Sequence, residues 1–256
     1  MPLALIDGDV IAYRCAASCE PNKSTRPDRR PVQLAISRAD ELMYRILSTT
    51  QSQEHRVFIS GGGNFRKSLY PAYKANRERL AKPVHLEACR EFLVREWGAT
   101  VCDGYEADDA IGIAHSEDPK AIICSNDKDF KQLVGEHYNF VKDEFEVVDS
   151  QMAALAFYSQ MLIGDASDNV PGIAGLGEAR APRLLRGLSP EEMHTRVSEI
   201  YGDERRFALN FRLLRILQSV DEWREVETTI SESKGQEPAE DSSREDIGDI
   251  SGADEE

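Results

Sequence analysis

Short apolar runs alternate with amphipathic stretches over the first 150 residues of the chain. The apolar runs have the length of buried strands and lie at residues 3–6, 56–59, 99–102 and 121–124. Apolar residues three and four apart predict helices over residues 34–47 and 84–97, and further helices are expected near Glu106 and Asp127. This alternation predicts an α/β fold with a mostly parallel central sheet flanked by helices.

The pattern changes after residue 149. Helices separated by Pro and Gly are expected over residues 150–164, 177–187, 190–201 and 204–218. We therefore expect three parts: an α/β core over residues 1–149, a helical lobe over 150–228 and a tail over 229–256. Residues 20–31, EPNKSTRPDRRP, are expected to form a mobile loop.

The net charge of −15 argues at first against a nucleic-acid partner. However, residues 231–256 hold ten acidic and two basic residues, which leaves only −7 for the other 230. Such a composition predicts a disordered tail, either solvating or docking a protein partner. No apolar stretch is long enough to cross a membrane, and no secretion signal is recognisable. The five cysteines include no CxxC pair, so we expect a cytoplasmic protein with reduced thiols.

Carboxylates follow three of the predicted strands and the first helix of the lobe. They are Asp7, Asp9, Glu106, Asp108, Asp109, Asp127, Asp129, Asp165 and Asp168. Because parallel strands end at the same edge of a sheet, we expect most of these side chains to gather there. One acidic pair at a helix start is usually only a cap, but four groups in matching places predict a site.

So many carboxylates repel one another unless cations offset their charge. Oxygen ligands suit Mg²⁺ or Mn²⁺, and two such ions about 4 Å apart can promote phosphodiester hydrolysis. Without the nine carboxylates, the first 230 residues carry a net charge of +2. The acidity therefore does not exclude work on a polyanion.

Two further segments suit phosphate binding. In residues 64–79, NFRKSLYPAYKANRER, cations alternate with aromatic residues, and the candidates for DNA contact are Arg66, Lys67, Tyr73, Lys74 and Arg77. The alternative is a solvated loop with amphipathic anchors. In the second segment, PGIAGLGEARA, the pattern predicts a helix–hairpin–helix, with candidates Gly172, Gly175, Gly177, Arg180 and Arg183. A simple turn between two helices is the alternative there.

Five ordered motifs resemble the flap endonuclease/5′→3′ exonuclease family, with a PIN-like core, and are most similar to its phage-encoded members. They are IDGD (6–9), YPAYKANR (70–77), YEADD (105–109), SNDKDF (125–130) and GDASDNVPGIAGLGEARA (164–181). The resemblance implies a nuclease that uses two Mg²⁺ or Mn²⁺ ions, with K⁺ at the helix–hairpin–helix. The implied substrates are DNA 5′ ends, flaps or RNA–DNA hybrids, and we expect a monomer.

The resemblance also assigns roles to residues. It implies that Asp7, Glu106, Asp108, Asp127 and Asp129 hold the ions, and that Asp109, Asp165 and Asp168 complete the set. Lys74 and Arg77 match the residues that contact the scissile phosphate, so that these two and Asp7 are the catalytic candidates. Residues 172–181 match the motif that binds the duplex backbone.

Two departures from the family pattern matter. Many members carry an Asp after the second strand, where this chain has Gly61. A catalytically weakened relative that binds DNA structures is therefore one alternative, and a PIN-type ribonuclease is another. Only 28 residues separate Arg77 from Glu106, so we expect an open groove or a short clamp in place of a tall arch.

Overall fold

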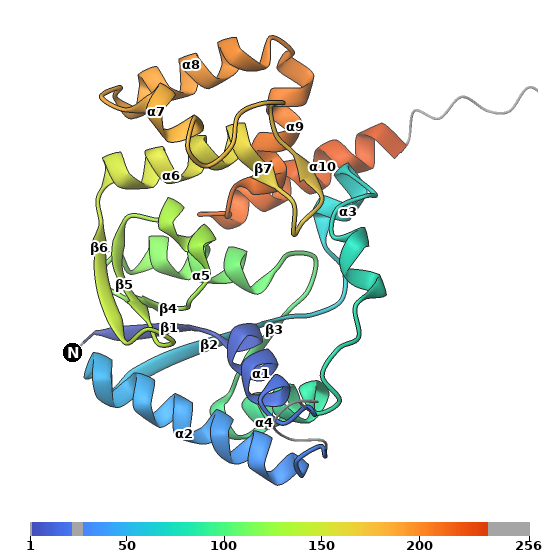
Figure 1. Ribbon diagram of the computed structural model, residues 1–256, viewed down its shortest axis with the longest axis vertical. Helices are drawn as coiled ribbons and strands as arrows, with labels where there is room; N and C mark the ends of the chain where they lie inside the picture. Colours follow the sequence, from blue (N-terminus) through green and yellow to red (C-terminus); the bar gives the residue numbers. More distant parts are fainter. Residues whose placement is uncertain (1, 22–27, 235–256) are drawn as a thin grey trace, which may run out of the picture.

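A six-stranded sheet forms the centre of the computed structural model, which describes residues 2–21 and 28–234 (Figure 1). The strand order is β3-β2-β1-β4-β5-β6, parallel except for the antiparallel edge strand β6. The strands are β1 (Leu3–Asp7), β2 (Glu54–Ser60), β3 (Thr100–Cys102), β4 (Ile122–Cys124), β5 (Gly135–Asn139) and β6 (Glu144–Val148). The four predicted strands and the mostly parallel sheet are confirmed. The hairpin β5–β6 was missed because β5 is mostly polar and two glutamates interrupt the apolar residues of β6.

Helices cover both faces of this sheet. The first face packs against α1 (Gly8–Ala17), α2 (Val32–Thr50) and α4 (Leu86–Trp97), and the second packs against α5 (Ala107–Glu117). Shorter helical segments are α3 (Phe65–Leu69) and the 3₁₀ helices η1 (Ala75–Arg79) and η2 (Lys128–Gln132). Within residues 2–21 and 28–234, none of the helices combines the length and apolarity needed to span a membrane.

A helical lobe follows β6 and lies at the top of Figure 1. It contains α6 (Ser150–Ile163), the small hairpin β7 (Gly164–Asp165) and β8 (Val170–Pro171), α7 (Ala181–Leu185), α8 (Pro190–Tyr201) and α9 (Glu204–Leu214). Buried apolar side chains from α6, α7, α8 and α9 form a core of their own. The predicted helical lobe is therefore present.

Several predicted boundaries were wrong. Helix α1 was not among the predicted helices and starts directly after Asp7, whose carboxylate accepts a hydrogen bond from the N–H of Val10. The helix expected near Asp127 is only the short η2. The helix expected over residues 177–187 is shorter, because residues 178–180 form a turn and α7 spans only Ala181–Leu185.

The predicted tail and loop lie partly outside the described residues. Helix α10 (Val220–Lys234) runs past residue 229, where we expected disorder to start, and residues 235–256 are not described. Of the loop expected over residues 20–31, residues 22–27 are likewise outside the described part.

After α9 the chain returns from the lobe to the α/β core. Ile216 joins the core beside α5, while Leu217 and Val226 pack with Phe65 and Ile113. Gly112 of α5 makes this approach possible, because a Cβ there would lie 2.3 Å from the carbonyl oxygen of Leu217.

A buried ion pair holds the returning segment in place. Arg66, 2 % exposed, donates two hydrogen bonds to Asp109, at 2.6 and 2.8 Å, and others to the carbonyl oxygens of Leu213 and Arg215. Asp109 is fully buried and also accepts a hydrogen bond from the N–H of Leu217. The pair therefore links α3, α5 and the segment after α9.

Removing one partner of this pair is expected to be costly. Arg66→Met leaves the Asp109 carboxylate buried without its cation, which should lower the free energy of unfolding by about 3–5 kcal/mol. Urea denaturation measures this loss. The double variant Arg66→Met/Asp109→Leu should recover much of it, and a single variant within about 0.5 kcal/mol of the wild type would contradict the assignment.

Candidate functional site

A cavity of about 840 Å³ opens at the carboxyl ends of β1 and β4. Its acidic lining residues are Asp7, Asp9, Glu106, Asp108, Asp127 and Asp129. The three groups of carboxylates that follow β1, β3 and β4 therefore gather at one edge of the sheet, as the strand order predicts.

Asp7 stands at the end of β1 and caps α1. Its carboxylate accepts hydrogen bonds from the N–H of Val10 at 3.1 Å and from the Ser125 hydroxyl at 2.8 Å. Burial outweighs these hydrogen bonds and raises the pKa of Asp7 to about 7, and the charges of Asp9 and Asp127 act in the same direction.

Asp127 and Asp129 follow β4 at the start of η2. The Asp127 carboxylate accepts the N–H of Asp129 at 3.0 Å, which directs the exposed Asp127 side chain into the cavity. Burial and the charges of Asp127 and Asp165 raise the pKa of Asp129 to about 7. Gln160 of α6 donates a hydrogen bond to Asp129 at 2.9 Å, which joins the lobe to this part of the site.

Glu106 and Asp108 stand at the start of α5 and differ in their electrostatics. Although burial acts against it, the cations of Lys74 and Arg66 hold the pKa of Glu106 below its usual value. For Asp108, burial and the neighbouring charges of Asp109 and Glu106 raise the pKa well above the usual value. The same two cations also act on Asp108, but burial and the neighbouring carboxylates outweigh them there.

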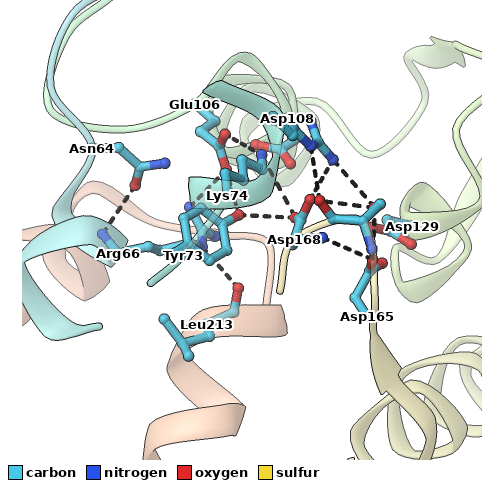
Figure 2. Close-up of polar contacts among 12 residues, drawn as sticks. Asn64, Arg66, Tyr73, Lys74, Glu106, Asp108, Asp129, Asp165, Asp168 and Leu213 are labelled. Atoms are coloured by element: carbon cyan, nitrogen blue, oxygen red, sulfur yellow. Dashed lines mark hydrogen bonds and ion pairs between the residues drawn. The ribbon is translucent and has the colours of Figure 1, made fainter. Parts of the chain in front are cut away.

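Two cations bridge the α/β core and the lobe, as Figure 2 shows for Lys74. Lys74 forms ion pairs with Glu106 and, at 3.6 Å, with Asp168, and its N–H donates to the Asp168 carbonyl. Arg77 forms an ion pair with Asp168 and donates a hydrogen bond to the Ser167 carbonyl at 3.0 Å. The predicted phosphate-contacting cations therefore lie beside the predicted metal ligands.

Asp165 ends β7, and Asp168 lies in the loop between β7 and β8. Asp165 accepts hydrogen bonds from the hydroxyl and N–H of Ser167 and the N–H of Asp168. Burial acts to raise the pKa of Asp165, but these hydrogen bonds hold it below the usual value. Asp165 is therefore an ionised carboxylate at the lobe side of the site.

Tyr73 is buried between the two halves of the site. Its hydroxyl lies 2.8 Å from a Glu106 oxygen and 3.1 Å from an Asp168 oxygen (Figure 2). Only 2 % of Tyr73 is exposed, so the prediction that it contacts DNA is wrong for this conformation. It instead connects a carboxylate of the α/β core to one of the lobe.

Two more predicted roles are contradicted by burial. Arg66 is enclosed by Asp109 and the carbonyls of Leu213 and Arg215, so it cannot reach a phosphate. Asp109 gives both oxygens to Arg66 and accepts the N–H groups of Glu106 and Leu217, so it is not placed as a metal ligand. The adjacent Lys67 is exposed, and its predicted role stays a prediction.

The cavity also contains a pair that sequence reasoning missed. Arg90 of α4 forms an ion pair with Asp9 and donates to the carbonyl of Ser60, while the N–H of Ser60 donates to Asp9 at 2.8 Å. Ser125 and Gln160 were missed as well. Ser125 stands in the SNDKDF motif but was not singled out beside its acidic residues, whereas Arg90 and Gln160 stand in no motif and reach the site only through the packing of their helices.

Gly61 is the residue at which the resemblance places an acid in many family members. Its N–H donates to the Cys102 carbonyl at 2.7 Å, and a Cβ at Gly61 would lie 2.3 Å from that same oxygen. No side chain fits here without a shift of the backbone. The close approach of the chain after β2 to the end of β3 therefore requires glycine at this position.

The glycines of the predicted helix–hairpin–helix differ in their roles. A Cβ on Gly172 would lie 2.2 Å from the backbone of Ile163, so this glycine serves close packing. Gly175, at φ +80°, and Gly177 have open space around the Cα and present exposed backbone. Arg180 and Arg183 are exposed beside them, so this surface can be reached by a polyanion.

The carboxylates fit divalent ions by their chemistry. Among the residues that the structure describes, no three acidic, His or Cys side chains are close enough to form a ready metal cage. Their oxygens instead accept from Lys74, Arg77, Tyr73 and Ser125. The donor set is all oxygen, and the pKa values of Asp7 and Asp129 are raised first by burial and then by neighbouring negative charges, which a divalent cation would offset.

Comparisons with curated proteins find bacterial DNA polymerases. DNA polymerase I of Pseudomonas aeruginosa is 30% identical over 213 residues, which are 73% of this chain and 22% of that protein. The thermostable DNA polymerase I of Thermus filiformis is 31% identical over 197 residues, which are 71% of this chain and 23% of that one. The chain thus spans less than a quarter of their length.

Solved structures show the same fold over most of the chain. The T5 5′-exonuclease with bound zinc has a TM-score of 0.66 and 16% identity, covering 91% of this chain and 99% of that one. The bacteriophage T5 flap endonuclease in a pseudo-enzyme-product complex with DNA and metal ions also has a TM-score of 0.66. It is 15% identical, covering 92% of this chain and 100% of that one.

The model of a protein family matches the α/β core itself. The match is to the 5′-3′ exonuclease, N-terminal resolvase-like domain, over residues 2–158. It extends from β1 into α6 and so includes the strand ends that carry the carboxylates of the cavity. Because this match takes in more than half of the chain, the protein belongs to the 5′-3′ exonuclease N-terminal domain family of nucleases.

Proposed function

We propose that this chain is a divalent-metal-dependent 5′ nuclease that hydrolyses phosphodiester bonds at or near the 5′ ends of DNA. The observation that supports this most is the gathering of five carboxylates and two cations around one cavity. The carboxylates are Asp7, Glu106, Asp108, Asp127 and Asp129, and the cations are Lys74 and Arg77. Carboxylates suit the ions, and the cations suit the phosphate.

Within this proposal, the five carboxylates hold the ions, directly or through water, and Asp165 and Asp168 support them from the lobe. Bound divalent ions would supply water activation and stabilisation of the developing negative charge. Lys74 and Arg77 bind the phosphoryl oxygens and orient the scissile bond. In the absence of substrate they pair with Glu106 and Asp168, so substrate binding requires them to exchange these partners for phosphate.

The substrate is proposed from the lobe. The open backbone at Gly175 and Gly177, with Arg180 and Arg183 beside it, suits the backbone of a DNA duplex, with K⁺ as its companion ion. An RNA–DNA hybrid carries phosphate groups along its backbone in the same way, so it is a further proposed substrate. Mg²⁺ is the proposed ion at the carboxylates, and we propose a monomer in the cytoplasm, that of the host if the chain is phage-encoded. A protein partner for the tail stays a prediction.

One observation favours a second candidate function. Because Gly61 has no room for a side chain, the family's acid at that position is absent, which would weaken one ion site. A relative that binds DNA structures without cutting them is therefore the alternative. It predicts DNA binding but no cleavage with Mg²⁺.

Replacing Asp127 tests the proposed site. Asp127→Asn keeps the side-chain oxygen that accepts the N–H of Asp129 but removes a negative charge from the cavity. Cleavage of a 5′-flap duplex should fall at least about 100-fold, the size typical of losing one electrostatic stabiliser, while DNA affinity persists. Glu144→Gln, which removes an exposed charge on β6 outside the cavity, is the matched control. Wild-type turnover by Asp127→Asn would refute the assignment.

Metal should stabilise the protein more at high pH. Because the folded-state pKa values of Asp7 and Asp129 are raised to about 7, their contribution to stability falls as pH rises from about 4 to 7. Above pH 7 both carboxylates are charged in the folded protein, so the full loss of stability is present and both groups are free to bind a cation. Thermal unfolding should therefore show a larger rise in Tm with Mg²⁺ at pH 8 than at pH 5.5.

The same measurement has a clear control. Asp7→Asn/Asp129→Asn removes both raised groups, so this variant should be more stable than the wild type at pH 8 without metal and should lose most of the Mg²⁺ effect. An equal rise in Tm at both pH values would contradict the prediction.

A further inference from the structure

The cavity extends beyond the carboxylates to a wall that the proposed mechanism does not use. This wall is made by α1 and α4, which pack against each other. Its lining residues are Tyr13, Arg14, Ser18, Leu86 and Arg90. We call it the α1–α4 wall. It brings two guanidinium groups to the same cavity as the carboxylates.

Arg14 lies in the last turn of α1 and is exposed. Among the described residues its side chain has no ion-pair partner or hydrogen bond, whereas Lys74 and Arg77 are both paired with carboxylates. An unpaired guanidinium lining a cavity beside six carboxylates is available to an anionic ligand.

Arg90 is held in one orientation by Asp9 and the carbonyl of Ser60. Its side chain is 21 % exposed. A guanidinium has five N–H donors, and the contacts with Asp9 and Ser60, with the Glu87 carboxylate 3.8 Å from the Arg90 Nε, leave others for a ligand in the cavity. Of the two guanidinium groups of the wall, Arg90 shares its charge with Asp9 and the exposed Glu87, whereas that of Arg14 is open to an anion.

The position of the wall indicates which anion. In Figure 1 the lobe with its glycine-rich loop lies at one end of the molecule, α1 and α4 lie toward the other, and β1 and β4 lie between. A strand leaving a duplex held by the lobe crosses the carboxylates before it reaches the wall. In a 5′ nuclease, the part of this strand that lies beyond the scissile bond, as seen from the duplex, is the 5′ segment that cleavage releases.

We propose that Arg14 and Arg90 form a phosphate subsite that binds the DNA backbone on the 5′ side of the scissile bond, within the released segment. This inference rests on the proposed function for its direction along the strand. It adds a second contact that holds the scissile phosphate over the carboxylates. Helix α4, which carries Arg90, is part of the short 78–105 segment between Arg77 and Glu106, and together with α1 it takes the role of retaining the 5′ segment.

The test combines protein and substrate changes. A 5′-flap duplex carries one neutral methylphosphonate either at the linkage directly 5′ of the scissile bond or three linkages into the duplex. For the wild type, the 5′ substitution should lower kcat/KM about tenfold, as expected for one charge-assisted contact. Arg14→Ala should lose about the same factor on the ordinary substrate and little more on the neutral one.

Arg95→Ala is the matched control, because this arginine is exposed on α4 and does not line the cavity. It should behave as the wild type with every substrate. Arg90→Gln should show the same reduced response to the neutral linkage, with unchanged thermal unfolding showing that it folds. If Arg14→Ala loses as much from the 5′ neutral linkage as the wild type does, the subsite is wrong.

Binding separates this inference from the proposed function. The same set of proteins and DNAs is measured by fluorescence anisotropy in EDTA, where no cleavage takes place. A reduced penalty for the neutral linkage in Arg14→Ala supports the subsite even if the wild type does not cut with Mg²⁺ or Mn²⁺, a result that would refute the nuclease activity alone. An equal penalty in both proteins overturns the subsite.

Discussion

The burial of several carboxylates close together at one edge of the sheet is the constraint on which the rest of the structure depends. Burial raises the pKa values of Asp7, Asp108 and Asp129, so these groups resist ionisation where they stand. Lys74 and Arg66 offset the charge of Glu106, and Arg90 offsets that of Asp9. A divalent ion would neutralise the remaining negative charge. The buried negative charge that destabilises the folded protein therefore also suits the site to metal and phosphate.

The same charges hold the two halves of the molecule together. Asp168 of the lobe accepts Tyr73, Lys74 and Arg77 of the α/β core, while Gln160 of α6 reaches Asp129. The segment after α9 is held by the buried Arg66–Asp109 pair. The carboxylates of the site therefore also join the lobe to the α/β core. These contacts fix the distance between the part of the lobe that is proposed to bind the duplex and the proposed cleavage site.

Positions along strands were predictable from the sequence, whereas side-chain directions were not. The apolar runs and the acids that follow them place Asp7, Glu106 and Asp127 at one edge, and the structure agrees. Arg66 and Asp109 look like site residues by spacing, yet they turn inward because the returning chain offers carbonyls and N–H groups to them. Arg90 stands in no motif and reaches the cavity only because α4 packs against α1.

The central claim is that these carboxylates serve metal-dependent cleavage near DNA 5′ ends. The most direct measurement is a time course on a 5′-labelled flap duplex, with the wild-type chain in Mg²⁺ and in EDTA. The account predicts short labelled products in Mg²⁺ and intact DNA in EDTA. Intact DNA in both, with the duplex bound, would contradict it.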